Sequence, residues 1–413
     1  AKRWIKTGNT WYYVMSNGAR QTGWLWLGVW YYLDPANAGA MKTGWYQDTS
    51  KRWFYSNSSG AMLAKRWIKT GNTWYYVMSN GARQTGWLSL GVATYYLNPA
   101  QAGAMVVGDF KVSNVSYRAD ASGALVKNAW VSMGGNKLAF AGSNGALNSG
   151  AERTSDGKII IKDSSGKIRT GWINFGGYRF FADPSKGGRL ATGWTTSNGK
   201  KYYFDSNYAP HKGWLLLNGR WYYFDSDGAM ATGWRKVGGS WFWLRSSDGV
   251  MLTGSQYVDN AWNYFYANGA WDATASYMMR RAQGISSNTG WLILVDTSAC
   301  RTTVFSRSSN SWVVNQTWSC SPGAYGTPTK KGYFTVGSRG YYFDSGASRC
   351  FYWTQFSGNY LFHSVLYART ATPQYIRDGR LGMNLSHGCV RLDVNCAKWI
   401  YDRIPFGTRV YTY

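Results

Sequence analysis

Two scarce and reactive residue types meet in the segment SHGCVRL, residues 386–392. The chain of 413 residues has only three histidines and five cysteines, yet His387 lies two positions before Cys389. A cysteine thiol that a neighbouring imidazole activates is a strong nucleophile, and the thioester that it forms divides acyl transfer into two easier steps. The segment therefore predicts covalent catalysis by Cys389.

The segments around this motif predict a mostly β domain with about two helices. Apolar and alternating runs such as GWLILVDTSACRTTVF, GYFTVGS and YLFHSVLY are rich in β-branched and aromatic residues, which favour strands. The segment VNCAKWIYDRI (394–404) predicts one clear helix. Upstream, ATASYMMRRAQ (273–283) contains helix formers and no turn residues, so it predicts a short helix that joins this part to the rest.

These segments, in their order, resemble the L,D-transpeptidase (YkuD) catalytic domain. The resemblance runs from about residue 289 to the C-terminus and rests on TGWLILVD, GTPTKKGYFTV, RGYYFDSG, YWTQFSGNYLFHSVLY and DGRLGMNLSHGCVRL. It implies that Cys389 is the nucleophile, that His363 is the base and that the carbonyl of Ser364 orients the imidazole. Many members have Gly where this chain has Ser364.

The resemblance also implies roles for the rest of the motif. His387 and Gly388 would line the site, and backbone N–H groups around Gly388 and Cys389 would form an oxyanion hole. Arg391 would support the site, for example by holding a substrate carboxylate. The resemblance implies that no metal or organic cofactor is needed, and separately no CxxC or His-cluster spacing suggests zinc.

The same resemblance implies an enzyme that acts on peptidoglycan stem peptides and joins them by 3→3 cross-links through a Cys thioester. One alternative is an L,D-carboxypeptidase, in which water resolves the thioester. Another is a wall-binding surface protein with an inactive catalytic domain, against which the intact Cys389 and His363 argue. The sequence does not separate transfer from hydrolysis, because the two reactions differ only in the acceptor.

The first two thirds of the chain are repeats. Residues 1–25 recur identically at 64–88, and a shorter unit of about 20 residues begins at successive Gly-Trp pairs. Its clearest copy is GWLLLNGRWYYFDSDGAMATGW, in which aromatic residues favour strands and the Asn-Gly and Asp-Gly pairs favour hairpin turns. A lone hairpin is marginal in water, so stacking of the units into a solenoid is expected. From about 106 to 170 most Trp residues are missing, and we expect hairpins there without an aromatic pocket.

The repeats resemble the choline-binding, or cell-wall-binding, repeats of bacterial surface proteins. In that family, aromatic residues of consecutive hairpins form a cage for a quaternary ammonium group, which they attract by cation–π interactions. The matching residues here are Trp214, Trp221, Tyr223, Met230, Trp234 and Trp241. A second set is Trp4, Trp11, Trp24 and Trp30, and a third is Trp67, Trp74 and Trp87. The alternative interpretation is that these aromatic residues only form the core of the solenoid.

Composition limits the partners. The chain has 45 Lys and Arg against 19 Asp and Glu, a net charge of +26 that attracts polyanions. Because the aromatic residues follow a hairpin period, a nucleic-acid partner is not expected; a wall polymer is, whether choline-bearing, anionic and teichoic-like, or a glycan. No apolar run is long enough to span a membrane. Together with Cys300, Cys320, Cys350 and Cys396, an even set beside one free nucleophile, these features favour an extracellular, wall-associated protein.

The sequence thus predicts a repeat solenoid over 1–272, a connecting helix over 273–288 and a catalytic domain over 289–413.

Overall fold

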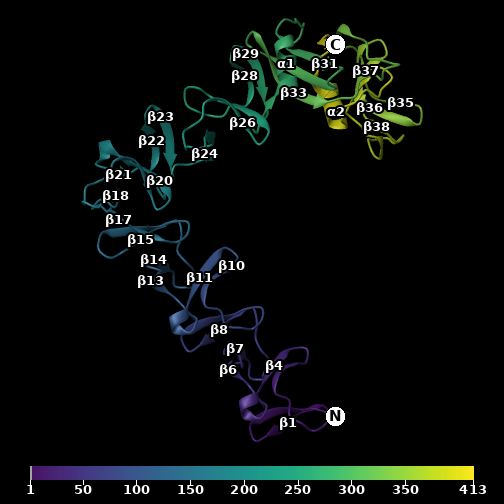
Figure 1. Cartoon of the computed structure of the whole chain (residues 1–413). Coiled ribbons are helices and arrows are strands. Elements are labelled where there is room, and N and C mark those ends of the chain that lie inside the picture. The colour runs from purple at the N-terminus through teal and green to yellow at the C-terminus, as the bar shows by residue number, and fades with distance from the viewer. Residues whose placement is uncertain (1) are drawn as a thin grey trace. The chain divides into compact units, whose positions relative to one another are not determined.

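The computed structural model describes residues 2–413 and divides the chain into two compact units. One consists of Ala1–Thr196 and Tyr203–Pro210, and the other of Ser197–Tyr202 and His211–Tyr413. Strands dominate both units, and the described residues contain two α-helices, α1 (Ala273–Ala282) and α2 (Val394–Arg403) (Figure 1). The predicted fold class, mostly β with about two helices, is confirmed. Neither helix is long and apolar enough to cross a bilayer.

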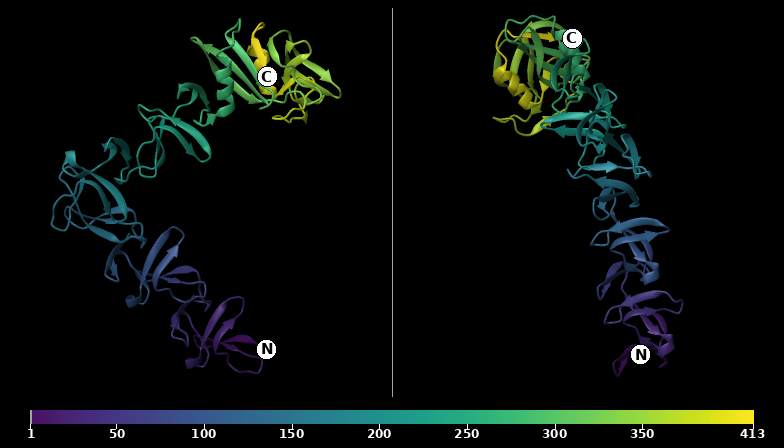
Figure 2. Two further views of the ribbon diagram at one scale, coloured as in Figure 1. Left: turned by 45° about the horizontal axis from the view of Figure 1, so that its top comes forward. Right: turned by 90° about the vertical axis from the view of Figure 1, so that its left-hand side faces the viewer.

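The repeats form antiparallel hairpins that follow one another along the chain (Figure 2). Their paired strands are β1 (Arg3–Thr7) and β2 (Thr10–Val14), β3 (Gly23–Trp26) and β4 (Trp30–Asp34), β6 (Gly44–Gln47) and β7 (Trp53–Ser56), β8 (Arg66–Thr70) and β9 (Thr73–Val77), β10 (Gly86–Leu90) and β11 (Ala93–Asn98), β13 (Gly108–Val112) and β14 (Val115–Ala119), β19 (Gly171–Phe175) and β20 (Tyr178–Asp183), β22 (Gly193–Ser197) and β23 (Lys200–Phe204), β24 (Gly213–Leu217) and β25 (Arg220–Phe224), β26 (Gly233–Val237) and β27 (Ser240–Leu244), and β28 (Gly254–Val258) and β29 (Ala261–Phe265). Short strands β5 (Ala40–Met41), β12 (Ala104–Met105), β21 (Arg189–Leu190) and β30 (Trp271–Asp272) add to these sheets, and single 3-10 turns lie at η1 (Pro35–Asn37), η2 (Pro99–Gln101) and η3 (Pro184–Lys186).

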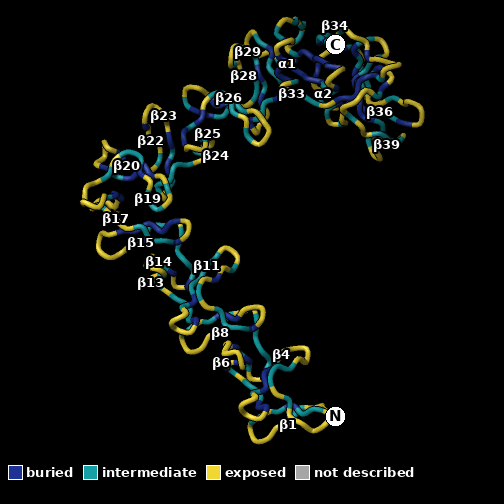
Figure 3. The backbone as a smooth tube through the Cα atoms, viewed as in Figure 1, coloured by how far each residue is buried: buried dark blue, intermediate teal, exposed yellow. Residues whose placement is uncertain are grey.

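The hairpin turns use the chemistry that the sequence predicts. In the β24–β25 hairpin, Leu217 pairs with Arg220, so the loop consists of Asn218 and Gly219 alone. Both loop residues have positive φ, 49° and 74°, which is the conformation that a two-residue type I′ turn requires and that Asn-Gly favours. Figure 3 shows the result along the chain: buried strand segments alternate with exposed turns.

The degraded stretch departs from the hairpin pattern. Here β15 (Ala129–Ser132), β16 (Lys137–Ala141), β17 (Leu147–Arg153) and β18 (Ile159–Ile161) form one four-stranded sheet rather than two separate hairpins. The three consecutive isoleucines of β18 are all buried, and Ile159 and Ile161 pack in a cluster with Phe140 and Phe180. Aliphatic residues therefore share this core with aromatic ones, and β18 joins the sheet by pairing with β17.

The C-terminal part consists of two sheets with a common core. One sheet has the order β33 (Ser311–Ser319), β32 (Arg301–Ser308), β31 (Trp291–Asp296), β41 (Arg409–Thr412) and β34 (Gly332–Thr335). The other has the order β39 (Ile376–Asp378), β38 (Leu366–Tyr367), β36 (Ser348–Ser357), β37 (Tyr360–Ser364) and β40 (Val390–Leu392), and β35 (Arg339–Ser345) pairs with β36. Buried apolar residues of both sheets meet Ala397 and Ile400 of α2, so this helix closes the core.

Helix α1 belongs to the same fold as the strands that follow it. Its residues Met278, Met279 and Ala282 are fully buried against β31–β33, and Trp262 of the last repeat hairpin packs on the same cluster. The side chain of Asp272 caps the helix by accepting a hydrogen bond from the Ala275 N–H at 2.9 Å. The predicted helix at 273–283 is therefore present as α1, and both the last repeat hairpin and strands β31–β33 pack on the same cluster of its buried residues.

Candidate functional site

Two adjacent parallel strands bring the predicted base to the cysteine motif. Strands β37 and β40 pair so that His363 lies opposite Arg391 and Phe362 lies opposite Val390. Cys389 directly precedes Val390, the first residue of β40, which pairs with Phe362 in the middle of β37. His363 and Cys389, which are 26 positions apart in sequence (389 − 363), thus come to neighbouring strands at one edge of the sheet.

His363 is buried, and its environment fixes the protonation state of the ring. Only 4% of the residue is exposed, and Nδ1 lies 2.7 Å from the carbonyl oxygen of Ser364. Because a carbonyl oxygen can only accept, Nδ1 carries the proton and Nε2 has a free lone pair. Burial lowers the pKa of His363 from 6.5 to about 4, although the bond to Ser364 opposes this shift. The ring is therefore neutral at physiological pH.

An aromatic ring also holds this imidazole in place. The ring of Phe343 meets that of His363 edge to face, with the centroids 5.2 Å apart and the planes at 87°. Phe343 lies in β35, directly opposite Cys350 of β36. The Ser364 carbonyl and the Phe343 ring together restrict rotation of His363.

Cys389 is a thiol in the resting structure. Its Sγ lies 3.4 Å from the carbonyl oxygen of Asn359, to which a thiol can donate. Burial raises the pKa of Cys389 above its usual value, against the smaller opposing effects of the Leu361 backbone and Arg391. If Cys389 is the nucleophile and His363 the base, the two neutral groups would transfer the proton as the sulfur attacks rather than before.

Hydrogen bonds fix the turn that carries the nucleophile. The hydroxyl of Ser386 accepts from the Gly388 N–H at 3.0 Å and donates to the Cys389 carbonyl at 2.5 Å. Thr329 Oγ1 donates to the Gly388 carbonyl at 2.8 Å. Gly388 has φ +113°, and a Cβ atom there would lie 2.8 Å from a ring carbon of Tyr360. Glycine is therefore required both by backbone conformation and by space.

Arg391 is a largely buried cation. It is 8% exposed, and its Nη1 donates to Asp378 Oδ2 at 3.3 Å. A bond from Arg380 and, to a lesser extent, the charge of Arg391 lower the pKa of Asp378 to about 2, so the carboxylate stays ionised. Arg391 Nε is buried and makes no hydrogen bond within the described residues. Its predicted role toward a substrate carboxylate stays a prediction.

The two histidines near the nucleophile occupy different environments. His363 is enclosed, whereas His387 is exposed to solvent. The sequence did not indicate Asp378, Phe343, Asn359 or Thr329, because they come from separate loops and strands and form no motif with Cys389. Among the described residues, no group of three or more His, Cys, Asp or Glu could hold a metal ion, and the five cysteines are unpaired.

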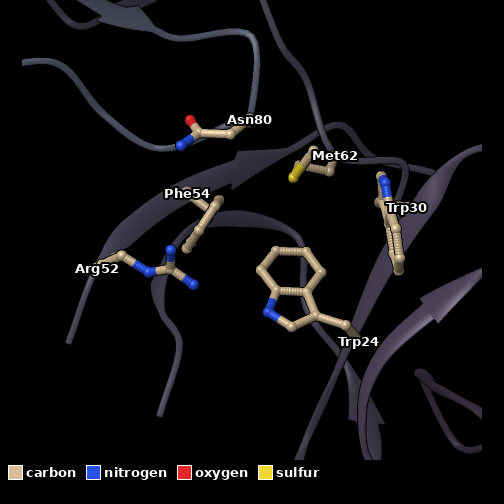
Figure 4. Close-up of a pocket in the computed structure, with 6 residues that line it drawn as sticks. All are labelled: Trp24, Trp30, Arg52, Phe54, Met62 and Asn80. Carbon is tan, nitrogen blue, oxygen red and sulfur yellow. The ribbon is translucent and has the colours of Figure 1, made fainter. Parts of the chain in front are cut away.

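The repeats contain aromatic cavities, each built by successive hairpins. One cavity of about 340 Å³ is lined by Trp24, Trp30, Arg52, Phe54, Met62 and Asn80 (Figure 4). A second, of about 290 Å³, is lined by Trp4, Trp11, Tyr31, Met41, Ser58 and Ser59, and a third, of about 330 Å³, by Trp67, Trp74, Tyr95, Met105 and Ser122. In each, one hairpin supplies two tryptophans, the next supplies an aromatic ring and a methionine, and a later turn closes the side. The second predicted set thus contributes to two cavities, and Trp67 and Trp74 of the third set to one.

The predicted cage at residues 214–241 is divided between two hairpins. Trp214 and Trp221 meet at 6.3 Å and 89°, and Trp234 and Trp241 at 6.2 Å and 89°. These perpendicular pairs match that of Trp24 and Trp30, at 6.2 Å and 86°. Tyr223 packs on Trp214 at 5.1 Å.

Met230, the methionine of the set predicted at residues 214–241, is bonded to an earlier hairpin than the one that carries Trp214 and Trp221. The Met62 N–H donates to the Trp30 carbonyl at 2.8 Å, and the Met251 N–H donates to the Trp221 carbonyl at the same distance, whereas the Met230 N–H donates to Lys201. Phe242 meets Trp214 at 4.8 Å and 69°, as Phe54 meets Trp24 at 4.7 Å and 72°. Phe242 and Met251, which the sequence-based set omits, therefore complete the arrangement around Trp214 and Trp221.

Comparison with known proteins separates the same two parts. Residues 290–412 match the family model of the L,D-transpeptidase catalytic domain. Residues 191–232 and 211–253 match that of the choline-binding repeat, and 2–19, 43–62 and 65–82 match a cell wall binding repeat.

Individual proteins show partial similarity. A Bacillus subtilis (strain 168) protein named as an L,D-transpeptidase, YciB, is 39% identical over 61 residues, which are 14% of this chain and 31% of that protein. The solved structure of CbpJ from Streptococcus pneumoniae TIGR4 is 24% identical and covers 66% of this chain and 100% of its own, with a TM-score of 0.30. An L,D-transpeptidase from Mycobacterium smegmatis is 22% identical and covers 30% of this chain and 58% of its own, with a TM-score of 0.24. The chain thus carries an L,D-transpeptidase catalytic domain at residues 290–412, preceded by choline-binding repeats.

Proposed function

We propose that this protein is an extracellular, wall-anchored enzyme that forms 3→3 cross-links between peptidoglycan stem peptides. The observation that carries the proposal is the pairing of β37 with β40, which sets a neutral, oriented His363 beside the strand that Cys389 directly precedes. The family of the catalytic domain and the repeats that precede it support the choice of substrate.

The first half-reaction acylates Cys389. The thiol attacks the carbonyl at the L-centre of the third residue of a donor tetrapeptide, and Nε2 of His363 takes the proton as the C–S bond forms. The imidazolium then returns the proton to the amine of the terminal D-Ala, which leaves. The Ser364 carbonyl stabilises the imidazolium, because it accepts from Nδ1 throughout.

The second half-reaction transfers the acyl group. An amine of a neighbouring stem peptide attacks the thioester, His363 takes a proton from that amine, and Cys389 leaves as the thiol. The product carries a new amide bond between two third residues. Hydrolysis would follow the same path with water as acceptor, and it would release a tripeptide.

The repeats would hold the enzyme on the wall and so raise its local concentration near the substrate. Three cavities lined by tryptophans and methionine suit a quaternary ammonium group such as choline. The net charge of +26 favours an anionic polymer as the carrier of that group.

The decisive experiment supplies disaccharide-tetrapeptide to the full chain and identifies the products by mass spectrometry. A cross-linked dimer with loss of D-Ala supports transfer. Free tripeptide without a dimer would replace the proposal with a carboxypeptidase, and an unchanged substrate would favour an inactive catalytic domain on a wall-binding protein.

A further inference from the structure

One aromatic cage of the repeats has an arginine at the position where its neighbours have methionine. The Arg83 N–H donates to the Trp53 carbonyl at 2.8 Å, as the Met62 N–H donates to the Trp30 carbonyl at 2.8 Å. The residue that lines the cavity in Figure 4 as Met62 is therefore represented, one hairpin later, by Arg83.

The rings around Arg83 are those of a complete cage. Trp45 and Trp53 come from the β6–β7 hairpin, and Tyr75 comes from β9 in the next one. Trp45 meets Tyr75 edge to face at 5.3 Å and 69°, as Trp24 meets Phe54 at 4.7 Å and 72°. These three rings thus correspond to Trp24, Trp30 and Phe54.

The guanidinium of Arg83 lies among all three rings. Its central carbon is 4.7 Å from the ring centroid of Trp53, 5.1 Å from that of Trp45 and 5.6 Å from that of Tyr75. Within residues 2–413 no carboxylate forms an ion pair with it, whereas Arg52 of the neighbouring cavity is bound to Asp48 at 2.8 Å. The positive charge of Arg83 is thus stabilised by cation–π interactions with the three rings.

We infer that Arg83 is a built-in cation that occupies this cage and excludes a quaternary ammonium ligand from it. The inference rests on the proposed function, since it assigns choline-type cations to the cages that methionine lines and denies them to the cage that holds Arg83. Exclusion has two causes: the guanidinium fills the space between the rings, and its positive charge repels a second cation. Arg83→Met should therefore create a new binding site.

The chain supplies a matched control. Residues 64–88 repeat 1–25, so Arg20 stands in the same local sequence as Arg83 and makes the equivalent bridge, Val14 with Arg20 as Val77 with Arg83. Its guanidinium lies over one ring, Tyr12, at 3.9 Å, rather than among three. Arg20→Met should add no site. The reciprocal change, Met105→Arg, should fill the cage that Trp67 and Trp74 line.

The test is an indole 1H–15N NMR titration of the full chain with choline chloride, with sodium chloride at equal ionic strength as the blank. Replacing Trp53 or Trp74 by Phe assigns the two reporter signals. In the native chain the Trp74 signal should shift saturably and the Trp53 signal should not. In the Arg83→Met variant both the Trp53 and the Trp74 signals should shift. In the Arg20→Met variant only the Trp74 signal should shift, and in the Met105→Arg variant neither signal should shift.

Other outcomes overturn the inference. A saturable Trp53 shift in the native chain means that Arg83 does not exclude the ligand. A silent Trp53 in Arg83→Met, with Trp74 still responding, means that the cage does not open, and the proposed ligand survives. If no indole responds in any variant, the choline-type ligand and this inference fail together. Should Arg83→Met perturb the fold, which the remaining indole signals report, the loss of the Trp74 response in Met105→Arg still decides whether an arginine at this position blocks a cage.

Discussion

His363 and Arg391 are direct neighbours across two parallel strands, β37 and β40. This pairing sets the neutral imidazole of His363 and the buried cation of Arg391 on neighbouring strands, with Cys389 two residues before Arg391. The positive charge of Arg391 adds to the lowering of the His363 pKa that burial causes, and it opposes the rise that burial causes in the pKa of Cys389. The charge of Arg391 therefore favours the thiolate form of Cys389 and disfavours the imidazolium form of His363.

Replacing Cys389 by Ala should abolish covalent labelling by a carbapenem, which acylates the catalytic thiolate of L,D-transpeptidases. The loss of labelling should be complete, because no other cysteine directly precedes β40 beside β37. Intact-protein mass spectrometry measures the adduct. Cys396→Ala, at another half-buried cysteine, is the control and should keep the label. An adduct that persists in Cys389→Ala would assign the nucleophile elsewhere.

Replacing His363 by Ala should slow acylation by about 10²–10⁴-fold, the range typical of a lost general base. His387→Ala should have a smaller effect, because His387 is exposed whereas His363 is buried against the Ser364 carbonyl. Stopped-flow measurement of the acylation rate compares the two. A crippling effect of His387→Ala with a mild effect of His363→Ala would reverse the roles.

The acylation rate should fall on the acid side with a midpoint near pH 4. His363 must be neutral to accept the thiol proton, and burial lowers its pKa from 6.5 to about 4, so protonation begins only at low pH. Between pH 5 and 8 the rate should change little, because the pKa of Cys389 is raised. A pH series of single-turnover rates checks this, and a midpoint between 6 and 7 would contradict the buried, neutral imidazole.

Gly388→Ala should impair acylation far more than Gly382→Ala. Both glycines have positive φ, +113° and +82°, so both substitutions strain the backbone. Only at Gly388 would the new Cβ come within 2.8 Å of the Tyr360 ring, while at Gly382 it would meet no atom within 4 Å. Acylation rates and circular dichroism of the two variants separate a displaced nucleophile from general unfolding. Equal losses would show that backbone strain alone decides.

Local sequence patterns predicted the elements well. Asn218-Gly219 and similar pairs mark hairpin turns because few other residues tolerate positive φ, and the helical segments 273–282 and 394–403 contain neither Gly nor Pro. The four-stranded sheet at 129–161 was not predicted, because the choice between two hairpins and one sheet depends on what the isoleucines of β18 contact. That contact is not encoded in any local period.

The candidate sites show the same division. Cys389 stands out by its motif, but His363 was identified only through resemblance to a family, since its approach to the motif depends on the pairing of distant strands. Phe343 and Asp378 gave no signal for the same reason. Among the cages, the sequence grouped Met230 with Trp221 by proximity along the chain. The hydrogen bond from Met251 to Trp221 instead follows from how one hairpin stacks on the next, which spacing does not reveal.

The burial of α1 limits how far the C-terminal domain can move relative to the last repeat hairpin. If residues 273–288 formed a flexible tether, the catalytic part would range over roughly 20 Å around the last hairpin. Instead Met278 and Met279 are enclosed, and Trp262 of that hairpin packs on the same cluster, so no free joint exists at this boundary. Under the proposed function, the catalytic domain would then act on the stem peptides that lie close to the last repeat hairpin. The choice of acceptor peptide would therefore depend on the spacing of the glycan strands in the wall, and not on free diffusion of the catalytic domain on a flexible linker.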